Sequence, residues 1–329
     1  MTAPFTKSSF SSAGTCAEAA TVSRTFLVHD YDLAATLNSG QTFRWQLREG
    51  WWEGVIGLRW VRLRAETVLR TSRKAAENET SVIIAETAEP VNDWRWLADY
   101  LQVGLNLADI LGTFPDDQPM RLAVAACRGL RLVRQDPWEC LASFILSSTK
   151  RIVQIQQIVA RLCEQFGEQV IVPQNHQPVY TFPLSGRIAA AGESELRACK
   201  MGFRAPNLHT AAQRIAGGTV DMGRLSALPV GEAREALMRL PGVGRKIADC
   251  VLLFAYGFQD AFPVDVWVMK ALRRLYFPRR QVTLKRLHKF AATHFGPYAG
   301  YAQQYLFHYA RVHAKLSDWD FDRAYDPKH

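Results

Sequence analysis

A lysine directly after a glycine-rich turn has the clearest chemical potential in this sequence. Lys246 follows Leu-Pro-Gly-Val-Gly at 240–244 and lies in the first turn of a helix predicted to open at Arg245 or Lys246. The positive end of that helix's dipole disfavours an ammonium, and a neutral lysine amine can form a Schiff base with a sugar carbon. Taken alone, a lysine at this position is more simply explained as a phosphate contact.

A carboxylate further along the chain favours the chemical role. The stretch FPVDVWVMKALRRLYF begins sixteen residues after Lys246, and its Asp265 is predicted to cap an amphipathic helix. A carboxylate held at a cap is rigidly oriented and kept ionised. Capping alone is the structural alternative, and the two roles are compatible.

The lysine belongs to a predicted helix-hairpin-helix motif at about 232–257. Pro241 is expected to stop its first helix, while Gly242 and Gly244 permit positive φ and the close approach of another backbone. Exposed amides at the amino terminus of the second helix form a phosphate seat. The alternative is a tight helix connection without a ligand. Ligases, recombination proteins and polymerases use such seats as well, so the motif indicates DNA but not a reaction.

These residues lie in the helical region 118–329, which follows a tail and a region with the pattern of a sheet. Residues 1–23 are rich in Ser, Thr and Ala and are predicted to be a disordered tail. Residues 24–117 contain short alternating apolar runs typical of an antiparallel sheet, followed by a helical or mixed stretch that covers one sheet face. Residues 118–329 are patterned as helices. The predicted class is α+β.

Composition favours an anionic partner in a reducing compartment. The net charge is +9, and cationic side chains gain free energy by displacing counterions from a polyanion such as DNA. The six cysteines are scattered without metal-ligand spacing, so we expect no metal site and an intracellular location with DNA. No apolar run reaches the roughly 20 residues needed to cross a bilayer. A monomer that needs no cofactor is the expected form.

Several sequence blocks resemble the 8-oxoguanine DNA glycosylases of the helix-hairpin-helix base-excision superfamily. They are LPGVGRKIADC followed by VDV, and also NSGQTFRW, DPWECLASFILSS, GFRA and GPYAGYAQQYLF, in the family's order from about Thr25 onward. The resemblance implies a TBP-like antiparallel sheet domain followed by an all-α helix-hairpin-helix glycosylase domain. It also implies double-stranded DNA containing oxidised guanine as the partner.

The resemblance implies a reaction in two steps. Lys246 would attack C1′ of a nucleotide flipped out of the duplex and expel the damaged base, and the Schiff base would permit β-elimination. Asp265 would stabilise the developing oxocarbenium charge and assist proton transfer. Phosphate contacts would come from the hairpin at Gly242, Gly244 and Ile247.

The resemblance also implies a base pocket. The Gly40 carbonyl would accept the N7 hydrogen that oxidised guanine has and guanine lacks. Gln303 and Phe307, four apart on one helix, would meet the pairing edge and stack on the base. Cys250, four residues after Lys246, would share its face. Taken one at a time, Gly40 could be a turn glycine, and Phe307 and Cys250 could be core residues.

The sequence departs from the family's pattern where the opposite base is read. The family has an asparagine and an arginine where this chain has Thr149 and Gln154, whereas Arg204 keeps a second cytosine-reading arginine and Phe203 is a candidate wedge. We therefore expect a relaxed requirement for cytosine.

A second departure from the family's pattern affects two residues that contact each other in the family. Trp267 replaces a histidine and Ala310 replaces the aspartate that supports it, so no orphaned charge is left. The histidine's phosphate contact must be absent or be replaced by the indole N–H of Trp267.

Two other functions stay open at this point. One is a related glycosylase for another damaged purine, against which Gly40 and Gln303 argue. The other is a non-catalytic helix-hairpin-helix DNA-binding protein, against which Lys246 and Asp265 argue.

Overall fold

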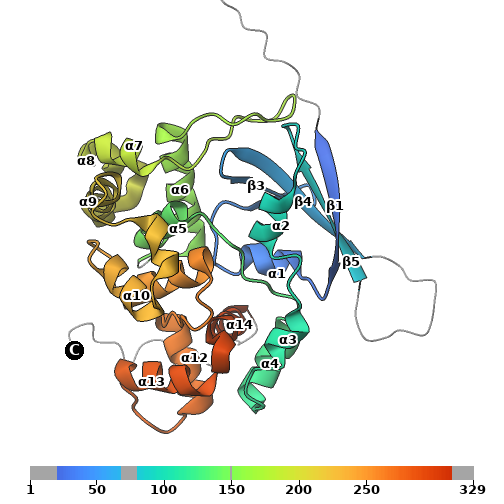
Figure 1. Ribbon diagram of the computed structural model, residues 1–329, viewed down its shortest axis with the longest axis vertical. Coiled ribbons are helices and arrows are strands. Elements are labelled where there is room, and N and C mark those ends of the chain that lie inside the picture. The colour runs from blue at the N-terminus through green and yellow to red at the C-terminus, as the bar shows by residue number, and fades with distance from the viewer. Residues whose placement is uncertain (1–20, 68–79, 149, 313–329) are drawn as a thin grey trace, which may run out of the picture.

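The computed structural model describes residues 21–67, 80–148 and 150–312. Most of the predicted tail and Thr149 lie outside these ranges, and Val22 and Ser23 from the end of that tail already belong to the first strand. A curved sheet lies on one side of the molecule and most helices lie on the other (Figure 1).

The sheet is antiparallel throughout, as predicted. Its order is β1-β5-β4-β3-β2, with pairs such as Leu63↔Ala85 across its centre. The strands are β1 (Val22–His29), β2 (Gln46–Arg48), β3 (Trp51–Ile56), β4 (Arg59–Thr67) and β5 (Thr80–Thr87). Alternate residues of β4 and β5 are fully buried against α1 (Leu33–Asn38) and α2 (Arg95–Leu101). These two helices cover one face of the sheet, as the sequence predicted for the stretch that contains α2.

The remaining helices share one large core. They are α3 (Leu107–Leu111), α4 (Gln118–Ala126), α5 (Pro137–Leu146), α6 (Ile152–Phe166), α7 (Ser185–Ala190), α8 (Glu193–Leu196), α9 (Ala205–Ala216), α10 (Val230–Met238), α11 (Arg245–Val251), α12 (Val266–Tyr276), α13 (Leu284–His294) and α14 (Ala299–Val312). Short 3₁₀ or π turns occupy Arg197–Met201, Gly202–Arg204, Met222–Ala227, Leu252–Tyr256 and Gly296–Tyr298.

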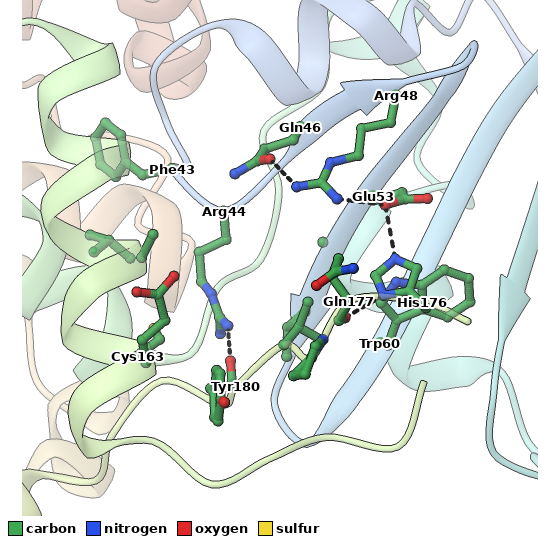
Figure 2. A pocket seen from close by; sticks show the side chains of 17 residues that line it. Phe43, Arg44, Gln46, Arg48, Glu53, Trp60, Cys163, His176, Gln177 and Tyr180 are labelled. Carbon is green, nitrogen blue, oxygen red and sulfur yellow. Dashed lines mark hydrogen bonds and ion pairs between the residues drawn. The ribbon is translucent and has the colours of Figure 1, made fainter. Parts of the chain in front are cut away.

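A cavity of about 160 Å³ lies where the sheet meets α6 and the segment that follows it (Figure 2). Arg44 bridges this boundary, pairing with Glu139 at 3.5 Å and donating to the carbonyl of Tyr180. His176 lies 3.2 Å from Glu53 of β3. None of the candidate site residues lines this cavity, and its polar contacts join the sheet to the helices.

Within the described ranges, no helix is long and apolar enough to cross a membrane, and no group of His, Cys, Asp and Glu has the arrangement of a metal site.

Candidate active site

The predicted hairpin is formed by α10 and α11. A buried ion pair links the two helices side by side: Nε of Arg234 on α10 lies 2.6 Å from Oδ1 of Asp249 on α11. Asp249 is 1% exposed, and Arg245 lies 3.6 Å from its other oxygen. This pair fixes the second helix against the first.

The turn between the helices differs from the prediction in where the first helix ends. The first helix ends at Met238, three residues before Pro241, because a separate turn intervenes in which Val243 N–H donates to the Leu240 carbonyl. Gly242 has the expected positive φ of 77°, and a methyl group there would lie 2.8 Å from Asn207. Gly244 has a φ of −90°, so it does not use the positive φ that a glycine permits. As the N-cap it needs only extended backbone.

The start of α11 leaves backbone donors available. The helix begins at Arg245, as predicted, and its first intrahelical bond runs from Ala248 N–H to the Gly244 carbonyl at 3.0 Å. The amides up to Ile247 therefore lack intrahelical partners. The Ile247 side chain is buried, so only its backbone is placed to meet a phosphate. A methyl group on Gly244 would meet nothing within 4 Å, so close approach from outside is open.

Lys246 extends from this helix toward α5. Its Nζ donates to Oγ of Ser147 at 3.5 Å and lies 4.9 Å from the ring centroid of Phe144. The Phe144 ring in turn stacks on Phe254. The amine is therefore held at one end by a hydroxyl and on one side by a buried aromatic face.

Asp265 caps α12, as predicted, with Oδ1 accepting from Val268 N–H at 2.8 Å. Burial raises the pKa of this carboxyl, while Lys246 and the backbone amides of the cap oppose the increase. The net direction is upward, so the expectation that capping alone would favour the ionised form was incomplete. Lys246 is thus the main charge that stabilises the carboxylate.

Cys250 lies one turn after Lys246 and is buried. Burial raises the pKa of its thiol to about 12, with Lys246 opposing and Asp265 adding to the increase. Lys246, Asp265 and Cys250 therefore lie within one another's electrostatic range. At neutral pH Cys250 is an uncharged thiol, suited to packing against a base.

The loop that contains Gly40 is fixed by buried amides. The Gln41 side chain donates to the Arg131 carbonyl at 2.7 Å and accepts from Val133 N–H at 2.8 Å. Gln304 of α14 donates to the carbonyl of Ser39 at 3.0 Å. These bonds hold the loop at one place against α14.

The structure brings Gly40 and Phe307 together. Gly40 has a φ of 79°, and a methyl group on it would lie 2.8 Å from Cδ1 of Ile152 and 3.4 Å from Cε1 of Phe307. Only glycine fits this position without strain or a shift of Ile152. The positive φ and the contact with Ile152 therefore both favour glycine at position 40.

Gln303 lies one turn before Phe307 on α14. Its side chain is buried, and its Oε1 has no hydrogen-bond partner among the described residues. An unpaired buried amide oxygen costs free energy unless a ligand or water satisfies it. The Gln303 oxygen is therefore available to a donor from a ligand or a water molecule.

Two family models match consecutive parts of this chain. The 8-oxoguanine DNA glycosylase N-terminal domain matches residues 25–141, and the HhH-GPD superfamily base excision DNA repair protein model matches residues 142–293. A relative from Arabidopsis thaliana, "N-glycosylase/DNA lyase OGG1", is 30% identical over 84% of this chain and 76% of its own length. The chain belongs to the 8-oxoguanine DNA glycosylase family.

Solved structures of the family agree with this fold. The structure of MBOgg1 with a low-affinity DNA ligand has a TM-score of 0.78 and 32% identity, covering 88% of this chain and 96% of that one. The Clostridium acetobutylicum 8-oxoguanine glycosylase/lyase, solved with DNA containing cytosine opposite 8-oxoG, has a TM-score of 0.77 and 28% identity, covering 89% and 98%. The predicted α+β class and family resemblance are confirmed.

The described residues that the resemblance assigns to reading the opposite base are Gln154, Phe203 and Arg204. Gln154 is exposed, and its Oε1 accepts from Arg151 N–H at 3.1 Å, which caps α6. Phe203 is 63% exposed, whereas Arg204 is 3% exposed and donates to the carbonyls of Ser148 and Met201. Arg204 therefore points inward here, and its contact with the opposite base stays a prediction.

The paired replacement is filled by apolar packing. Ala310 of α14 and Ala271 of α12 are both fully buried against each other, with Leu275 beside them. Trp267 lies half-buried on the first turn of α12. Small side chains thus bring α12 close to α14 where the family has a charged pair.

The sequence interpretation missed three residues of this site. Ser147 and Phe144 hold Lys246, and Ile152 lies against Gly40. Phe144 and Ser147 belong to the DPWECLASFILSS block, and Ile152 follows it. The resemblance of this block to the family was the signal in the sequence that could have identified them.

Proposed function

We propose that this family member is a bifunctional DNA glycosylase and lyase that excises 8-oxoguanine from duplex DNA, with Lys246 as the nucleophile. The main support is that the amine of Lys246 lies within electrostatic range of the capping carboxylate Asp265. The buried Gln303 oxygen, which lacks a partner among the described residues, supports a base contact on α14. The Arabidopsis relative is named an N-glycosylase/DNA lyase, and the Clostridium structure contains 8-oxoG opposite cytosine.

The base must leave the duplex before reaction, because stacking hides its glycosidic carbon. Backbone amides at Gly242, Gly244 and Ile247 would seat a phosphate of the flipped strand. The net charge of +9 supports the same partner. We propose that the enzyme acts as a monomer.

The flipped base would lie between Phe307 and Cys250, with its pairing edge at Gln303. The Gly40 carbonyl would accept a hydrogen bond from N7–H of 8-oxoguanine. Guanine has a lone pair on N7 instead, and this lone pair would repel the carbonyl oxygen. A site built for one hydrogen bond discriminates strongly when the bond is missing, since a polar group is then left unpaired.

Lys246 Nζ would then attack C1′, and the bond to N9 would break with its electron pair leaving on the base. Asp265 would stabilise the positive charge that develops on the sugar. Loss of a proton from Nζ leaves an aminal in which C1′ still carries the ring oxygen O4′. The nitrogen lone pair then forms the C=N bond as the C1′–O4′ bond breaks and O4′ takes a proton, which opens the sugar ring and gives the Schiff base. Removal of a C2′ proton then expels the 3′ phosphate.

Borohydride reduction of the Schiff base tests this proposal. We expect a covalent complex between the wild-type protein and a duplex containing 8-oxoguanine, and none with Lys246→Gln, which should still bind DNA. Repeating the assay with each opposite base tests the relaxed cytosine requirement inferred from Thr149 and Gln154. Absence of any adduct with active wild-type protein would contradict the lyase step.

A further inference from the structure

Arg311 lies at the edge of the base pocket and has no role in the proposed reaction. It follows Phe307 by one turn of α14, so Gln303, Phe307 and Arg311 form one stripe along the helix. Its guanidinium carbon lies 5.7 Å from the ring centroid of Phe307. The stripe therefore places a cation next to the proposed stacking ring.

The same guanidinium is fixed to the Gly40 loop. Its Nη2 donates to the carbonyl of Asn38 at 2.5 Å, and its Nη1 lies 3.6 Å from where a methyl group on Gly40 would stand. Nε and Nη1 form no hydrogen bond with another residue that the structure describes. One nitrogen thus anchors the group while a donor beside Gly40 stays available.

This placement matches the edge of the lesion. In 8-oxoguanine the N7 hydrogen has the oxygen O8 as its neighbour, so the edge presents a donor and an acceptor side by side. A carbonyl beside a guanidinium N–H is the complementary pair. Guanine presents N7 as an acceptor and a C8 hydrogen there, so both protein groups would face the wrong partner.

We propose that Arg311 is a specificity-determining residue that donates from Nη1 to O8 of the flipped 8-oxoguanine. The lesion would then be recognised at two adjacent atoms, N7 by Gly40 and O8 by Arg311. This role rests on the proposed function. It provides a charge-assisted hydrogen bond that guanine cannot form.

The test measures equilibrium binding in a Lys246→Gln background, which cannot react. Duplexes contain 8-oxoguanine, 8-thioguanine or guanine opposite cytosine. Arg311→Met should lower the preference for 8-oxoguanine over guanine about tenfold or more, because a hydrogen bond to a charged group is lost. Sulfur at C8 is a weak acceptor, so Arg311→Met should change the binding of 8-thioguanine much less.

Two control variants distinguish a contact to O8 from a general effect of positive charge. Arg24→Met, on exposed strand β1, removes the same charge and should leave the preference unchanged. Arg311→Lys retains a cationic donor and should keep part of the preference. The thermal midpoint of each variant is measured, and Arg311→Lys serves as the test if Arg311→Met unfolds.

The remaining outcomes would each overturn part of the proposal. An equal loss on all three duplexes indicates a backbone contact and overturns the role of Arg311. Additive effects of the sulfur and arginine substitutions overturn the contact to O8. If Arg311→Met keeps the full preference for 8-oxoguanine over guanine, the role of Arg311 is overturned and the proposed function stands. If the protein with Arg311 intact shows no such preference, the proposed function itself is contradicted.

Discussion

The reactive end and the recognition end of this site are built in different ways. Lys246 lies in the first turn of α11 and Asp265 caps α12, the next α-helix along the chain, so a helix start and a helix cap fix their positions. Gly40 meets α14 through contacts between segments 265 residues apart, such as the bond from Gln304 to Ser39. Local rules therefore place the reactive groups, whereas long-range packing shapes the pocket.

This difference predicts that substitutions at the two ends separate rate from selectivity. At the reactive end, Asp265→Asn should lower the single-turnover excision rate about a hundredfold to a thousandfold by removing a charge that acts on the transition state. Asn remains a good cap, so the unfolding free energy should change little, whereas Asp265→Ala should also lose about 1 kcal/mol. Quench-flow rates and urea unfolding measure both. Equal excision rates for the wild type and Asp265→Asn would show that Asp265 acts only as the N-cap of α12.

At the recognition end, Gly40→Ala should lower the preference for 8-oxoguanine. Its methyl group would meet Ile152 at 2.8 Å in a backbone conformation with φ of 79°. We expect a loss of about 1–3 kcal/mol in unfolding free energy and a fall of about tenfold in selectivity. Adding Ile152→Ala relieves the clash, so stability should partly return. Wild-type selectivity in Gly40→Ala, despite the expected loss of stability, would contradict the role of the Gly40 carbonyl.

The two hairpin glycines should behave differently from each other. Gly242→Ala is strained by its φ of 77° and by Asn207, and should lose about 1–2 kcal/mol of stability. Gly244 is exposed, and a methyl group there would meet no protein atom within 4 Å, so the stability of Gly244→Ala should stay within about 0.5 kcal/mol. Its binding to undamaged duplex should weaken, because the methyl group occupies the approach to the backbone amides. Calorimetry and fluorescence anisotropy measure the two effects. Unchanged DNA affinity in Gly244→Ala would mean that no phosphate approaches there.

The smallest effect concerns acid pH. Burial raises the pKa of Asp265, so the folded protein takes up its proton at a higher pH than an exposed aspartate. The excision rate should therefore fall on acidification through that raised pKa, and Asp265→Asn should remove this limb of the profile. The sign for stability is opposite, because a raised carboxyl pKa makes this group's contribution to folding less favourable as pH rises through it. A profile unchanged by the substitution would assign the limb to another group.

The same contrast explains what the sequence could predict. The start of α11, the cap at Asp265 and the antiparallel sheet follow from glycine, proline and alternation patterns that act over a few residues. The exact end of α10 was missed because several turn geometries are compatible with the same sequence between the helices. The inward position of Arg204 and the place of Arg311 beside Gly40 depend on tertiary contacts between distant segments. No spacing rule within a single segment predicts such contacts.

The identity of the attacking amine is the decisive observation for the proposed mechanism. After borohydride trapping on a duplex containing 8-oxoguanine, protease digestion and mass spectrometry would locate the reduced sugar. The mechanism predicts the adduct on Nζ of Lys246, with Lys246→Gln giving no adduct at any site. An adduct on another lysine or on the amino terminus would contradict it.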